Sequence, residues 1–179
     1  MTLLYRRLVV YVQSQTNDSA QKRAQEELKN VNLNEQVAIE SLLLANHVEL
    51  ADGRLYVSGG GWNTFHRLVP QGEGMVVNHL GVAVVVAIPW HQTNMKRDLI
   101  LELRDEDAKI IASNQTHIDV GRPAGLRHGQ IQYASLAWSL DLVFPHAGCY
   151  EVVARIEDVE GSERRWTFQV QDIRLAAAA

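Results

Sequence analysis

The chain has 179 residues, of which 46% are hydrophobic and 21% charged, and this composition is typical of one globular domain with some decoration. The formal net charge of −4 argues against a nucleic-acid partner, because dedicated nucleic-acid binders normally show a basic face. No segment approaches the roughly 20 consecutive apolar residues that cross a membrane, so we expect no membrane partner either.

The N-terminal segment does not look like a secretory signal. Arg6 and Arg7 split its apolar run, and no small-residue cleavage pattern follows. The single cysteine, Cys149, has no partner for an internal disulfide, so nothing in the sequence indicates an oxidising compartment. We therefore expect a cytoplasmic protein.

Residues 1–40 differ from the rest of the chain in their pattern of apolar and polar residues. The apolar run from Leu8 to Val12 predicts a short strand, and the pair Asp18-Ser19 is a helix N-cap signal. Small apolar residues recur after it at helical spacing, which predicts a helix over 19–30. We interpret residues 1–40 as an N-terminal helical extension that packs on the rest of the protein or forms a loosely attached arm.

From residue 41 onward, short apolar or alternating segments are separated by turn residues, as in strands. Asp52-Gly53 lies between two such segments and predicts a type I′ hairpin, because both central residues of that turn need positive φ. The nearly continuous apolar run 80–88 predicts a central strand buried on both faces. The segment Pro145 to Tyr150 resembles a tyrosine corner, in which a tyrosine hydroxyl bonds back to the backbone.

We therefore expect a mainly β protein, an antiparallel β-sandwich of the immunoglobulin-like, Greek-key type with eight or nine strands. The expected boundaries are an extension over 1–40, the sandwich over 41–172 and a tail over 173–179. No helix-length pattern separates the strands, which argues against a parallel sheet.

Three residues are candidates for ligand binding. Trp62 and Trp90 lie beside expected loops and could stack on a carbohydrate or another small molecule, although core packing is the alternative for each. Arg122 lies in a glycine-rich loop and could bind an anion through its guanidinium group. Its alternative role is to bind strand carbonyls.

Recognisable catalytic and cofactor motifs are missing from the sequence. Gly59-Gly60-Gly61 lacks the Lys and Ser or Thr of a phosphate-binding loop. The seven histidines show no spacing that places two on one face, so we expect no metal and no cofactor. A metal site that gathers histidines from distant strands stays open as an alternative. The histidines concerned are His47, His66, His79, His91, His117, His128 and His146.

A combination of short motifs resembles a bacterial family of uncharacterised proteins, the domain of unknown function 6941. The resemblance covers about residues 41–172. It is carried by Leu42-Leu43-Leu44-Ala45, Ala51 to Val57, Gly59 to Trp62, Ile88-Pro89-Trp90, Gly121-Arg122-Pro123 and the Pro145, Gly148 and Tyr150 pattern. It implies a sandwich with residues 1–40 as an extension, and it supplies no catalytic residues.

We expect a non-enzymatic interaction or structural module that forms a homo-oligomer or binds a protein partner. The motivation is a strand-rich chain without a catalytic set, joined to a polar helical arm. The alternatives are a sandwich that binds carbohydrate or a small ligand and an enzyme with a dispersed histidine metal site.

Overall fold

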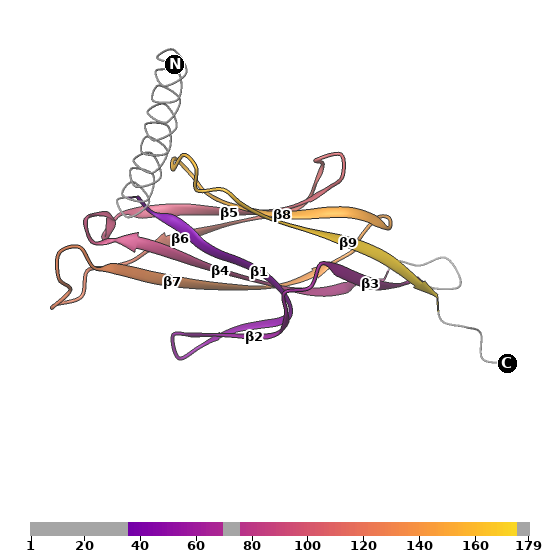
Figure 1. Cartoon of the computed structure of the whole chain (residues 1–179), viewed down its shortest axis with the longest axis horizontal. Helices are drawn as coiled ribbons and strands as arrows, with labels where there is room; N and C mark the ends of the chain where they lie inside the picture. Colours follow the sequence, from indigo (N-terminus) through magenta and orange to yellow (C-terminus); the bar gives the residue numbers. More distant parts are fainter. Residues whose placement is uncertain (1–35, 70–75, 175–179) are drawn as a thin grey trace, which may run out of the picture. The chain divides into compact units, whose positions relative to one another are not determined.

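The computed structural model describes residues 36–69 and 76–174, and their regular structure is almost entirely β (Figure 1). The short helix η1, Trp90–Gln92, is a single 3-10 turn. The predicted strand over 8–12 and helix over 19–30 lie outside the described residues. Within the described ranges, no helix is long and apolar enough to span a membrane. The strands are β1 (Ala38–Ala51), β2 (Arg54–Gly60), β3 (Thr64–Val69), β4 (Asn78–Pro89), β5 (Lys96–Asp105), β6 (Ile110–Asp119), β7 (Ile131–Leu142), β8 (Gly148–Ile156) and β9 (Arg164–Arg174).

The strands form two sheets. One has the order β2-β1-β4-β7 and is curled into a half-barrel, and the other has the order β3-β9-β8-β5-β6. The mainly β prediction is therefore confirmed. β3 and β6 are edge strands with polar, solvent-facing positions, which weakens the apolar alternation in their sequences.

One strand pair departs from the expected antiparallel arrangement. β3 runs parallel to β9, from Thr64 opposite Gln169 to Val69 opposite Arg174. Every other pairing between the described strands is antiparallel. The short connection after β2 brings the chain beside the middle of β9, where the N–H of Gln169 donates to the carbonyl of Asn63. From that point β3 continues along β9 in the same direction.

The main core lies between the two sheets. Alternate residues of β4 face the five-stranded sheet, and Val82, Val84 and Val86 are completely buried there. Leu99 of β5 and Val152 of β8 face them from the other side. Burial of such side chains stabilises a fold by about 1.5–3 kcal/mol each relative to exposure. This core holds the two sheets together.

A second, smaller core lies on the opposite face of the four-stranded sheet. Ala45, Val48 and Ala83 are buried in it, and Leu55 and Ala137 pack against them. The β1–β2 hairpin thus folds back over β4 and β7, and Figure 1 shows it on the side away from β5 and β8. The hairpin explains why β4 is buried on both faces, as the sequence predicted.

Gly81 allows this fold-back. A Cβ atom at Gly81 would lie 3.0 Å from the backbone nitrogen of Val48 and 3.1 Å from the carbonyl carbon of His47. Only a residue without a side chain lets the two backbones approach so closely. At the tip of the hairpin, Asp52 has φ 51° and Gly53 has φ 70°, so the predicted I′ turn is confirmed.

The predicted tyrosine corner is present at the start of β8. The Tyr150 hydroxyl donates to the carbonyl of His146 at 2.9 Å, and its ring packs edge-on against Phe144 at 5.0 Å. Burial raises the pKa of Tyr150, so the hydroxyl keeps its proton well into the alkaline range. The bond fixes the turn from β7 to β8.

We expect Tyr150→Phe to lower the free energy of unfolding by about 1 kcal/mol, because it removes one buried hydrogen bond and leaves the ring in place. Denaturant unfolding of both proteins measures the difference. Tyr133→Phe is the control, because the Tyr133 side chain is 63% exposed. Equal losses in the two variants would contradict a stabilising role for the corner.

Candidate interaction surface

Trp90 and Arg122 lie together at one end of the two sheets. The Arg122 guanidinium carbon is 3.7 Å from the centre of the Trp90 ring, which is a cation–π contact. The centre of the His128 ring lies 3.6 Å from the centre of the Trp90 ring. Arg122 also donates from Nη2 to the Trp90 carbonyl at 3.0 Å and from Nε to Thr93 Oγ1 at 2.9 Å. The Trp90 indole N–H donates to the Leu126 carbonyl.

These contacts tie the 120–130 loop to the connection between β4 and β5. Two guanidinium nitrogens of Arg122 already bind protein groups, in keeping with the structural alternative for this residue. The ring of Trp90 is covered by Arg122 and His128, which leaves less of it for a ligand. Ligand binding by Trp90 and Arg122 stays a prediction.

Trp62 lies elsewhere, in an aromatic cluster of the main core. Its ring is 5.6 Å from both Phe65 and Phe168, and its carbonyl accepts a hydrogen bond from the Trp166 indole. The Trp62 indole nitrogen is buried and has no hydrogen-bond partner. The structure does not bring Trp62 and Trp90 together, so they do not form a shared platform.

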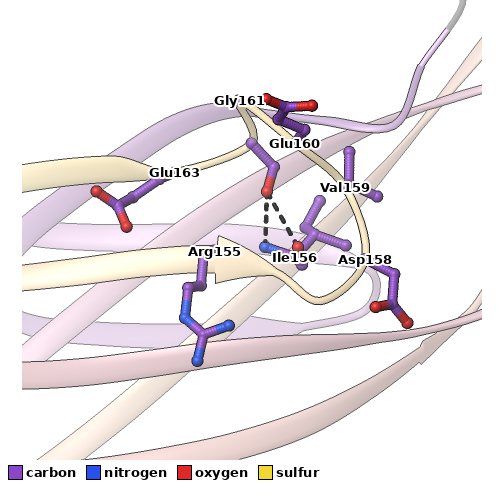
Figure 2. Close-up of a pocket in the computed structure, with 8 residues that line it drawn as sticks. Arg155, Ile156, Asp158, Val159, Glu160, Gly161 and Glu163 are labelled. Carbon is purple, nitrogen blue, oxygen red and sulfur yellow. Dashed lines mark hydrogen bonds between the residues drawn. The ribbon is translucent and has the colours of Figure 1, made fainter.

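The turn between β8 and β9 carries an open hollow of about 450 Å³. Figure 2 shows the carboxylates of Asp158, Glu160 and Glu163 pointing away from one another around it. Ser162 closes the turn from inside, since its Oγ bonds both the N–H and the carbonyl of Ile156. The hollow gathers no converging chemical groups.

The histidines make local pairs. His79 Nδ1 lies 2.9 Å from Asp141 Oδ1, and the His47 ring stacks beside His79 with centres 6.4 Å apart. In residues 36–69 and 76–174, no three His, Cys, Asp or Glu side chains are placed to hold a metal ion. The His79–Asp141 pair joins β4 and β7, so sequence spacing gave no signal for it.

Large apolar side chains are exposed on the β1–β2 hairpin instead. Leu50, Tyr56 and Val57 are 48%, 50% and 38% exposed. Val57 pairs with the buried Val48, so Leu50 and Val57 share the face that continues the small core, and Tyr56 points to the other face. We call these three residues the hairpin surface. This surface was not predicted from the sequence, because exposed and buried positions of a strand use the same apolar residues.

Comparison with known proteins places the chain in a family. A model described as "Family of unknown function (DUF6941)" matches residues 40–171. The protein belongs to this family. The match confirms the resemblance found in the sequence, and it assigns no activity to any DUF6941 residue.

Other comparisons add little about function. A search of curated proteins finds no match. One similar solved structure comes from work on glycolipid glycan hydrolysis by a family 123 glycoside hydrolase from Clostridium perfringens, with a TM-score of 0.31 and 11% sequence identity. The alignment covers 77% of this DUF6941 chain and 27% of that chain, so this protein spans about a quarter of it.

Proposed function

We propose that this DUF6941 protein is a non-enzymatic interaction module that binds a protein partner or self-associates. The proposal rests on the hairpin surface, where Leu50 and Val57 expose apolar area on one face of the hairpin and Tyr56 exposes it on the other. Large apolar side chains exposed close to one another are typical of protein-binding surfaces. Tyrosine is also among the residues that contribute most to binding free energy at such surfaces.

The proposed scaffold is an immunoglobulin-like, Greek-key sandwich preceded by a helical extension, in a cytoplasmic protein. The tyrosine corner at Tyr150 and the core shared by the two sheets support it. In such scaffolds a rigid pair of sheets presents loops and hairpins to partners. The hairpin is held to the body by Val48 and Leu55, which leaves Tyr56 and Leu50 available for contact.

Purification of the full-length chain from its native cells tests the proposal. We expect a defined complex with a partner protein or an assembly of several 20.1 kDa chains by light scattering. The Leu50→Glu, Tyr56→Ser double variant should weaken partner binding by roughly 10-fold to 100-fold, because both side chains are accessible and a charge opposes apolar contact.

The matched control is Glu49→Gln with Ser58→Ala, which changes polar, exposed positions of the same hairpin and should bind normally. Thermal melting of all variants checks that they are folded. A chain that is monomeric at all concentrations and retains no partner contradicts the proposed function. If both double variants bind equally well, the hairpin surface is not the binding surface.

A further inference from the structure

The β7 strand lacks the features that usually protect the edge of a sheet. It lies at the end of the four-stranded sheet and pairs only with β4 within the described part of the chain. Proteins block such edges with charged residues, prolines, bulges or very short strands, because an edge presents unpaired N–H and C=O groups. β7 has 12 residues without proline, and its one charged residue, Asp141, lies beside its end.

The pairing of β7 with β4 is also regular. It runs without a bulge from Asn78 opposite Leu142 to Pro89 opposite Ile131. The three other edge strands carry at least one protective feature. β2 contains an arginine and ends in glycines, β3 has 6 residues and an arginine, and β6 has a register shift that leaves its Ile111 without an opposite residue in β5. Among the described edges, β7 is the one best formed to accept another strand.

We propose that β7 pairs antiparallel with β7 of a second copy of this chain, so that a twofold axis joins two four-stranded sheets into one. The inference rests on the proposed function and specifies the surface used for self-association. Twofold dimers bury the same patch on both copies, and two identical edges related by an axis normal to the sheet run antiparallel. The pairing satisfies backbone groups that are otherwise left to water.

The charge distribution of β7 favours a second copy as the occupant. Antiparallel pairing places Asp141 of each copy beside the beginning of the partner strand, at the far end from the partner's own Asp141. Asp141 is the one charged residue of β7, so no like charges face each other across the joint.

Hydrogen exchange of the full-length protein tests the inference, at two concentrations that bracket the dissociation constant measured by sedimentation. We expect amides of β7 to gain protection at the higher concentration, while those of β2, β3 and β6 stay unchanged. Self-association with protection on another edge overturns the β7 inference and leaves the proposed function standing. A chain that stays monomeric overturns the β7 inference, and partner binding through the hairpin surface then decides the proposed function.

A charge variant gives a second test. Tyr133→Lys with Ser139→Lys places two cations on exposed positions of each β7, so the dimer brings four together. We expect dimerisation to weaken by at least roughly 100-fold. The control, Ser113→Lys with Gln115→Lys, adds the same charge to exposed positions of β6 and should dimerise normally. Equal dimerisation by both variants overturns the inference. If the β7 variant fails to fold, hydrogen exchange of the wild type tests the inference alone.

Discussion

Replacement of Phe168 by alanine should lower the free energy of unfolding by about 4 kcal/mol, the largest single effect that we expect. Phe168 is 1% exposed and stands at the centre of the aromatic cluster. Its ring centre lies 5.6 Å from Trp62 and 6.0 Å from both Phe144 and Tyr150. The substitution removes apolar contacts and leaves a cavity among large rings that cannot collapse into it.

Denaturant unfolding of the wild type and the variant measures this loss. Thr167→Ala is the matched control, because its side chain on the same strand is exposed, and it should stay within about 0.5 kcal/mol of the wild type. If Phe168→Ala does not fold, Phe168→Leu should still unfold at a clearly lower denaturant concentration. A Phe168 variant as stable as the control would show that the cluster is not a packed core.

The second large effect is expected at Gly81. We expect Gly81→Ala to destabilise the protein by about 2 kcal/mol, because the new methyl group meets the backbone of His47 and Val48 at 3.0–3.1 Å. Alanine ordinarily stabilises a strand relative to glycine. A lower free energy of unfolding in Gly81→Ala would therefore be opposite in sign to the intrinsic effect of this substitution.

Gly121→Ala provides the comparison for Gly81. The nearest atom to a Cβ at Gly121 is Asn94 Oδ1 at 4.0 Å, so we expect a change within about 0.5 kcal/mol. Hydrogen exchange should also show the amides of β1 and β2 losing protection in Gly81→Ala. An unchanged melting temperature and unchanged exchange would mean that the hairpin adjusts without cost.

Local chemistry explains which features the sequence predicted. The Asp52-Gly53 turn depends on two residues that tolerate positive φ, and the Tyr150 corner depends on one hydroxyl four residues from its acceptor. The burial of 80–88 followed from a nearly continuous apolar run. Each of these signals is contained in a few adjacent residues.

The contacts that the sequence did not predict join distant segments. His79 meets Asp141 on the neighbouring strand. Core packing was the alternative given for Trp62, but the sequence did not name its partner Phe168, more than 100 residues later in the chain. Trp62 and Trp90 have similar loop-like surroundings in sequence, yet only Trp62 joins the main core. Hydrophobic periodicity gives the face of a strand, but it does not give its neighbours.

The parallel pairing of β3 with β9 has a consequence for the order of events during synthesis. Thr64 finds its backbone partner, Gln169, only after the ribosome has made β9. Until then Trp62 lacks Phe168, the ring against which it packs. Completion of the five-stranded sheet therefore waits for β9, and a nascent chain that stops before β9 exposes this aromatic surface to chaperones and proteases.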